Sequence, residues 1–313
     1  MSEKTIEKSA PVEDAAPDKA AIAEEKAAAR EASLFKDGWS DLRKSWMFII
    51  SGAVIVLLLA LAIAPQLFTA RSPLSDGFCQ LQNSMNGPSS SHLFGYDLQG
   101  CDIYTRTVYA TRNSIIVGVV TSALTTMIGG LLGMIAGLRA GWLDSVLSRV
   151  TEVFFALPLI VGALLIASMF GAGDAWSVSV IMAVLGWPQV YRIMRGEVIA
   201  NKHNDYVMAA KALGASTGRI AFRHILPNTL APVIVITTMN LGVYISGEAA
   251  LSYLGIGVQA PNISWGLMIS DVQDRFLTSP HALLFPAGAL SITVLAFIML
   301  GDAVRDAFDP KLR

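Results

Sequence analysis

The sequence predicts an all-α membrane protein with six transmembrane helices, and two observations carry this prediction. First, 53% of the 313 residues are hydrophobic and only 15% are charged, whereas soluble domains carry about 25% charged residues. Second, the apolar residues gather in runs long enough to cross a bilayer, for which a helix needs about 20 residues. The formal net charge of -1 and the acidic N-terminal region argue against a protein that binds nucleic acid.

The N-terminal region is predicted to lie outside the membrane. Residues 1–34 are rich in Ala, Glu and Lys and have almost no large apolar side chain, so they cannot build a core. This cytoplasmic tail is expected to be disordered or to form a lone exposed helix. From Phe35 to Trp46, large apolar side chains recur at three- and four-residue spacing among basic residues. Residues 35–45 therefore predict an interfacial helix on the inner membrane surface, with a plain linker as the alternative.

Residues 46–313 are predicted to form one six-helix domain. Its apolar runs are 46–68, 113–138, 150–171, 176–194, 230–254 and 283–302. Basic residues set the orientation, because short cytoplasmic loops are enriched in Lys and Arg. If the N-terminus is inside, most basic residues near the spans lie on the inner side, and only Arg71, Arg106, Arg112 and Arg275 lie outside. Both termini are therefore expected in the cytoplasm, and the first span is expected to act as an uncleaved signal.

The outer segment at about 69–112 connects the first two spans. It is too polar to be buried in lipid and too long to be a simple turn, so we expect it to have local structure. It contains both cysteines of the chain, Cys79 and Cys101. On an oxidising exterior these are expected to form a disulfide that constrains the unfolded chain by about 3 kcal/mol. Two unrelated thiols are the alternative.

Two features inside the spans carry further predictions. Gly129, Gly133 and Gly137 recur at four-residue spacing, a pattern that lets another helix approach closely. Glu248 lies near the outer end of the fifth span, where a charge that faces lipid is costly. We expect Glu248 to form a structural ion pair with Arg106 or Arg112. Contact with a substrate in a transport path is the alternative.

The polar segment 195–229, between the fourth and fifth spans, cannot lie in hydrocarbon. From Tyr206 onward its composition favours a short helix, and Gly214 suits the left-handed conformation that ends one. A second turn is expected next, with Ser216 or Thr217 as its cap. The small and basic side chains suit docking to a soluble partner, and an ordinary amphipathic loop is the alternative. The residues expected to take part are Tyr206, Ala209, Ala210, Lys211, Gly214, Arg219, Arg223, Leu226 and Pro227.

This segment resembles the EAA loop of ABC-transporter permeases, which reads Glu-Ala-Ala, three residues, Gly, nine residues, Ile, one residue, Leu-Pro. The matching residues are Ala209, Ala210, Gly214, Leu226 and Pro227, while Met208 replaces the Glu and His224 the Ile. Its ending, Phe-Arg-His-Ile-Leu-Pro-Asn, is similar to that of the peptide/nickel branch, and to its second permease subunit in particular. Three more stretches resemble this branch in the same order, namely 92–102, 248–268 and 300–310. In the first of them Cys101 stands where the family usually has Arg.

The resemblance implies a type I ABC importer permease with cytoplasmic coupling helices, in the bacterial inner (plasma) membrane. It also implies four kinds of contact: a second, homologous permease subunit, two ATPase subunits that use ATP and magnesium, an extracytoplasmic substrate-binding protein, and the lipid bilayer. The cargo expected from this branch is a di- or oligopeptide. Nickel chelates, haem or another small solute share the architecture and are the alternatives.

Motifs typical of catalysis are absent from the sequence. It contains no G-x-x-x-x-G-K-[ST] phosphate loop, no H-E-x-x-H metal pair and no G-x-S-x-G nucleophile elbow. Its four histidines are spread over both sides of the membrane, which argues against a shared metal site. We therefore expect no catalytic residue, metal or cofactor in this chain. The competing classes are a self-contained channel and an intramembrane enzyme, but Glu152, Glu248 and Asp302 are too dispersed to suggest a catalytic set.

Overall fold

The computed structural model describes residues 38–73, 75 and 77–308, and helices dominate this part of the chain. The α-helices are α2 (Trp46–Ile63), α3 (Ile103–Arg139), α4 (Trp142–Ala156), α5 (Leu159–Phe170), α6 (Ala175–Asn201), α7 (Asp205–Ala212), α8 (Thr217–Arg219), α9 (Leu226–Tyr253), α10 (Trp265–Val272) and α11 (Pro280–Phe308). Shorter turns are η1 (Pro65–Leu67), η2 (Leu81–Asn83), η4 (Gln273–Arg275) and the π-helical η3 (Ile220–Ile225). The predicted all-α class is confirmed. The predicted tail 1–34 lies outside the described residues, and the predicted interfacial helix is described only from residue 38, as a short helix at 38–42.

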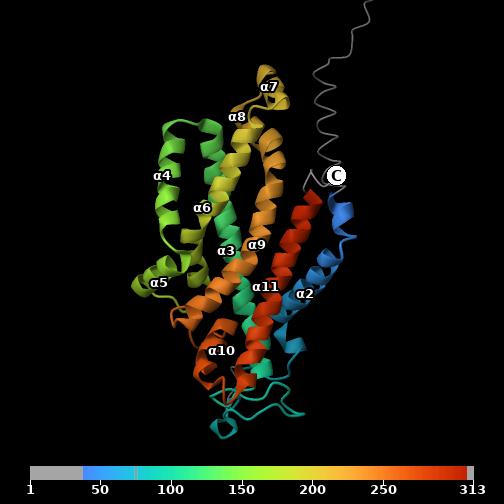
Figure 1. Cartoon of the computed structure of the whole chain (residues 1–313), viewed down its shortest axis with the longest axis vertical. Coiled ribbons are helices and arrows are strands. Elements are labelled where there is room, and N and C mark those ends of the chain that lie inside the picture. Colours follow the sequence, from blue (N-terminus) through green and yellow to red (C-terminus); the bar gives the residue numbers. More distant parts are fainter. Residues whose placement is uncertain (1–37, 74, 76, 309–313) are drawn as a thin grey trace, which may run out of the picture.

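The long helices α3, α6, α9 and α11 form the bundle, with α2 on one side and α4 and α5 on the other (Figure 1). Helices α3 and α6 lie against each other along most of their length, and the predicted glycines face this contact. A Cβ on Gly129 would lie 2.5 Å from the Trp187 carbonyl oxygen, and one on Gly133 would lie 2.7 Å from the Tyr191 carbonyl oxygen. A Cβ on Gly137 would lie 2.7 Å from the Cβ of Val198. Residues without a side chain therefore let the two backbones meet.

The two ends of the described chain lie on the same side of the bundle. Leu42, just before α2, is buried with Ala303, Val304 and Ala307 of α11. Helices α2, α4 and α9 run from this end toward the opposite end, and α3, α6 and α11 run back (Figure 1). The short helices α7 and α8 project from the first end, and α10 lies with the segment between α2 and α3 at the other (Figure 1).

Within the described residues, four helices are long and apolar enough to cross a membrane: α2, α3, the continuous helix Thr217–Tyr253, and α11. The pair α4 and α5 makes a fifth crossing if the two count as one span, although they are bent by 89°. Pro158 lies at this bend. It has no backbone N–H, so the hydrogen bonding of α4 cannot continue through it. Helix α6 is not among them, since it contains polar residues such as Gln189 and Arg192. Its packing against α3 removes the need for an apolar surface all round.

The second span begins earlier than predicted. Helix α3 starts at Ile103 rather than at 113, and the side chain of Asp102 caps it by accepting a hydrogen bond from the Thr105 amide at 2.8 Å. The polar residues of this first stretch, including Arg106, are buried against the outer segment and α10. The outer segment is correspondingly shorter and covers residues 64–102.

Candidate functional site

The coupling segment, residues 205–227, begins with helix α7. Its end has the hydrogen bonds of a Schellman motif: the Gly214 amide donates to the Lys211 carbonyl and the Ala215 amide to the Ala210 carbonyl, both at 3.0 Å. Gly214 has a φ of +82°, the left-handed conformation that glycine adopts without steric cost. Its missing side chain points into open space. The backbone conformation alone therefore explains the glycine.

The second half of the coupling segment is continuous with a membrane span. The hydroxyl of Ser216 caps α8 by accepting a hydrogen bond from the Arg219 amide at 3.4 Å. The chain then passes without interruption through η3 into α9, so that Thr217–Tyr253 is one helix of 37 residues. A displacement of α8 would therefore act on the start of α9 through a continuous backbone.

The predicted coupling residues do not all face outward. Ala209, Lys211, Gly214, Arg219 and Arg223 are exposed, whereas Ala210 is buried. Tyr206, Leu226 and Pro227 are half-buried, with Leu226 at the start of α9. The exposed residues are thus candidates for contact with a partner, and the buried ones hold the segment in place.

Three exposed apolar residues in the coupling segment were not among the residues predicted to dock a partner. Met208, Leu213 and Phe222 are 54%, 67% and 66% exposed. Their signal in the sequence is a large apolar side chain in an otherwise polar loop, which is typical of a binding surface. On the opposite side of the segment, Val207 and Ile225 are buried in a cluster with residues of α3 and α6.

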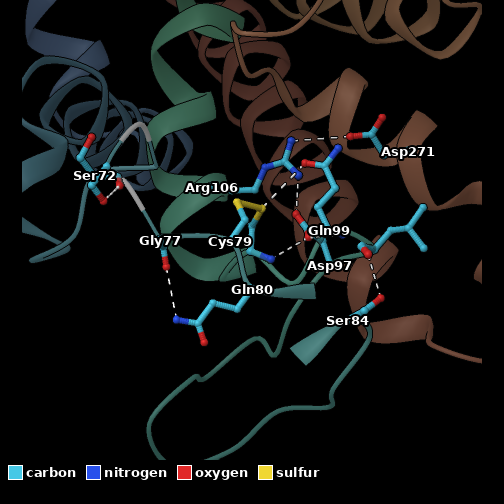
Figure 2. The surroundings of a disulfide bond; sticks show 12 residues. Ser72, Gly77, Cys79, Gln80, Ser84, Asp97, Gln99, Arg106 and Asp271 are labelled. Atoms are coloured by element: carbon cyan, nitrogen blue, oxygen red, sulfur yellow. Dashed lines mark hydrogen bonds and ion pairs between the residues drawn. A yellow bond between two sulfur atoms is a disulfide. The ribbon is translucent and has the colours of Figure 1, made fainter. Parts of the chain in front are cut away.

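At the end of the bundle opposite the coupling segment, a disulfide closes the segment between α2 and α3, which the sequence predicts to lie outside. Cys79 and Cys101 are bonded, which confirms that prediction. The closed loop is tied to α3 by Asp97: one of its carboxylate oxygens accepts hydrogen bonds from the amides of Gln99 and Cys101, both at 2.9 Å, and the other pairs with Arg106. Figure 2 shows Arg106 between the disulfide loop and α10.

Arg106 is also 3.6 Å from a carboxylate oxygen of Asp271 on α10 (Figure 2). One guanidinium thus serves two carboxylates, and it joins the disulfide loop, α3 and α10. Burial raises the pKa of Asp271 above its usual value, the charge of Arg106 opposes this shift, and the charge of Asp97 adds to it.

The predicted ion pair of Glu248 is wrong. Arg106 pairs instead with Asp97 and Asp271, and fully buried Glu248 is held by serine hydroxyls. The Ser252 hydroxyl donates to it at 2.7 Å and that of Ser114 at 3.5 Å. Hydroxyl donors offset part of the cost of burying a carboxyl group without a cation.

A third hydroxyl, that of Ser264, also lies close enough to Glu248 to favour its charged form. Each of the three serine oxygens also accepts a hydrogen bond from a backbone amide. Ser252 accepts from Val258 at 3.0 Å, Ser114 from Trp265 at 3.3 Å and Ser264 from Leu267 at 3.2 Å. These three amides belong to the segment between α9 and α10 and to the start of α10 itself. The Glu248 network therefore fixes the α9–α10 connection and the start of α10 to α3 and α9.

The structure keeps the two regions apart. The coupling segment lies at one end of the bundle, and α10 lies at the other (Figure 1). The disulfide just before α3, Arg106 near the start of α3 and Glu248 near the end of α9 belong to the second end. In the part of the chain that the structure describes, no group of three or more His, Cys, Asp or Glu residues is placed to hold a metal ion. A helical bundle of this length and apolarity, with a protruding helical segment at one end and a cross-linked cap at the other, is typical of the membrane subunit of a transporter.

Comparison with known proteins identifies the family. The chain belongs to the family described as the binding-protein-dependent transport system inner membrane component, whose profile matches residues 129–313. It is 37% identical over 289 residues to the oligopeptide transport system permease protein OppC of Bacillus subtilis, which covers 92% of this chain and 93% of the relative. It is 38% identical to the dipeptide transport system permease protein DppC of Alkalihalophilus pseudofirmus, with 90% and 91% covered. The glutathione transport system permease protein GsiD of Pectobacterium atrosepticum is 34% identical, with 89% and 92% covered.

Proposed function

We propose that this chain is a permease subunit of an ATP-driven importer of di- or oligopeptides, and that it exposes its transport path alternately to the two sides of the membrane. Two of the relatives are named as oligopeptide and dipeptide permeases, and both are aligned over at least 90% of this chain. The third is named for glutathione, which is also a short peptide. Nickel chelates, haem and other small solutes are the competing cargoes.

The observation that carries the coupling mechanism is the continuity of α8, η3 and α9. A soluble ATPase that docks on the coupling segment moves one end of a helix that crosses the membrane. The exposed side chains of Lys211, Arg219 and Arg223 provide cations for acidic groups on the ATPase, while exposed Phe222 provides an apolar anchor. Ala209 allows a close approach.

The complete importer in this proposal contains this chain, a second homologous permease, two ATPase subunits that bind ATP and magnesium, and a binding protein outside the membrane. The chain lies in the bacterial inner membrane, crosses it six times with the α4–α5 pair and α6 each counted as one span, and has both termini in the cytoplasm. The disulfide loop and α10 form the outer surface that meets the binding protein.

Reconstitution tests this function. The chain, its partner permease, both ATPases and the binding protein are placed in liposomes, and uptake of a labelled dipeptide and of a pentapeptide is measured with ATP and with a non-hydrolysable analogue. The proposal expects accumulation of at least one peptide that requires ATP hydrolysis. Nickel chelate and haem are measured in parallel. ATP-dependent uptake of one of these, without uptake of either peptide, contradicts the peptide proposal.

A further inference from the structure

A recess of about 350 Å³ opens at the outer end of the bundle, where the start of α6 faces α3 and the segment after α9. Two residues of opposite charge line it, Arg112 on α3 and Asp174 at the start of α6. Trp176, Tyr109 and Ile116 supply aromatic and apolar surface. The recess thus combines a cation, an anion and an apolar wall.

The walls of the recess are fixed by hydrogen bonds. Asn113 on α3 donates to the Ile263 carbonyl at 2.8 Å. Asn262 in turn donates to the Gly173 carbonyl at 3.1 Å, next to Asp174. A chain of contacts therefore runs from α3 through residues 262–263 to the start of α6. It holds the elements that carry the two charges in a defined arrangement.

Arg112 and Asp174 do not form an ion pair with each other. None of the ion pairs within the described residues includes Arg112 or Asp174. One carboxylate oxygen of Asp174 accepts the amides of Trp176 at 2.8 Å and Ser177 at 3.0 Å and so caps α6, which leaves its second oxygen available to a ligand. The hydrogen bond from the Ser177 amide, with that from Trp176, lowers the pKa of Asp174, so it remains an anion at neutral pH.

The recess lies on a side of α3 that other helices of this chain leave open. Val119, Met127, Leu131 and Ile135 follow along α3 and are 44%, 56%, 54% and 40% exposed. The last three line an inner groove of about 600 Å³, which also includes Phe222 of the coupling segment. One unpacked helix face therefore connects the recess with the coupling segment.

We propose that this recess is a cargo subsite that binds the two termini of a short peptide, with Arg112 on its carboxylate, Asp174 on its ammonium and Trp176 against an apolar side chain. A ligand with both charges bridges two protein groups that do not pair with each other. The inference rests on the proposed function, because it takes peptides as the cargo, and it names the chemical feature of the cargo that the permease itself reads.

Three peptides and two variants test this subsite in the complete reconstituted importer. The peptides are an apolar dipeptide with free termini, its C-terminal amide and its N-acetyl derivative. Arg112→Gln should lower kcat/KM for the free dipeptide about tenfold. It should leave kcat/KM for the amide unchanged, because the amide has no carboxylate that Arg112 could bind. Asp174→Asn should lower kcat/KM for the free dipeptide by a similar factor and leave that for the N-acetyl derivative unchanged.

The comparison of each variant with wild type on the same peptide cancels the preference of the binding protein. Asn is also a good N-cap, so Asp174→Asn removes the charge and keeps the start of α6. Arg275→Gln, at an exposed outer arginine away from the recess, is the matched control and should change none of the three rates. Co-purification of the ATPases with each variant verifies that the complex still assembles.

Three results overturn the subsite. The first is unchanged kcat/KM for the free dipeptide in both variants. The second is a parallel loss for all three peptides, which means that the residues are only structural. The third concerns the wild-type importer in liposomes without ethanolamine phospholipid. If its kcat/KM for the free dipeptide falls there as it does in both variants, the recess binds a zwitterionic lipid headgroup instead of the peptide. If the wild-type complex accumulates no peptide with ATP, the proposed function itself fails.

Discussion

The hydroxyl of Ser252 donates a hydrogen bond to the carboxylate of Glu248 one turn earlier on α9, and its oxygen accepts the amide of Val258 beyond the end of the helix. One side chain thus joins a fully buried carboxyl group to the segment that leads to α10. Gly257 has to be a glycine here, because a Cβ would collide with Ser252.

Ser252→Ala should lower the free energy of unfolding by about 2 kcal/mol, because it removes the shorter hydrogen bond to buried Glu248 and leaves the buried Val258 amide without its acceptor. Ser246→Ala is the matched control on the same helix. Its hydroxyl bonds only to the Gly242 carbonyl and the residue is exposed, so the change should cost no more than about 0.5 kcal/mol. Thermal unfolding in detergent measures both. Equal shifts for the two variants contradict the network.

Gly133→Ala should lower the stability of the α3–α6 contact by about 1–3 kcal/mol, because the new methyl group would overlap the Tyr191 carbonyl. Gly130→Ala is the control one turn away, where a Cβ meets only the end of Met194 at 3.8 Å. It should be neutral or slightly stabilising, since alanine favours the helix more than glycine. Thermal midpoints of the two variants provide the comparison, and a Gly133→Ala protein as stable as Gly130→Ala would show that the helices separate easily.

Gly214→Ala should cost about 1–2 kcal/mol in the local fold of the coupling segment, because its φ of +82° disfavours a residue with a Cβ. Membrane insertion should be unaffected while the amount of ATPase that co-purifies falls. Gly218→Ala changes a glycine of the same segment with negative φ and open space around it, so it should retain the ATPase. Unchanged ATPase recovery with Gly214→Ala argues against docking at this turn.

Cys101→Ser should loosen the outer segment, because the disulfide closes a loop with a sequence separation of 22. We expect lower peptide uptake and undiminished co-purification of the ATPases, since the coupling segment is at the opposite end. Cys79→Ser should have the same effect, which distinguishes loss of the bond from loss of one side chain. Mass spectrometry of non-reduced peptides tests the bond itself: free alkylation of both thiols in protein taken directly from membranes rules it out.

Asp271→Asn should alter the dependence of stability on pH. The folded protein raises the pKa of this carboxyl group, so the group favours the folded state below its unfolded pKa, and this contribution is lost as pH rises through the folded pKa. The stability of the wild type relative to Asp271→Asn should therefore fall as the pH rises from about 3.8 toward neutrality. Thermal midpoints of both proteins across this range measure it. A constant difference contradicts the raised pKa.

The sequence predicted the helical class, the disulfide and the helix that ends at Gly214 because each has a local signal. Apolar runs indicate membrane helices, two cysteines on one side indicate a bond, and Gly214 after an Ala-rich stretch indicates a helix end. The partner of Glu248 has no local signal. Ser114 and Glu248 are 134 positions apart, and only the fold shows that serines replace the expected arginine.

The start of α3 was missed for a related reason. Hydropathy reports which residues tolerate lipid, whereas α3 extends into a stretch where Arg106 is satisfied by two aspartates. The bend between α4 and α5, by contrast, has a local signal, because Pro158 lies within the apolar run 150–171 and has no backbone N–H to continue a helix. Helix length depends on capping and on packing partners as well as on apolarity.

The unbroken helix from Thr217 to Tyr253 begins in the coupling segment and ends beside the outer Glu248 network. Because this helix joins the coupling segment to the α9–α10 end, a partner that binds at one end can change the binding free energy at the other. Thermodynamic linkage then sets a symmetric rule: if nucleotide binding changes the affinity for the external binding protein by some factor, that protein changes the affinity for nucleotide by the same factor. A continuous helix that carries this coupling carries it in both directions. Docking of the external binding protein then changes nucleotide binding as much as nucleotide binding changes that docking.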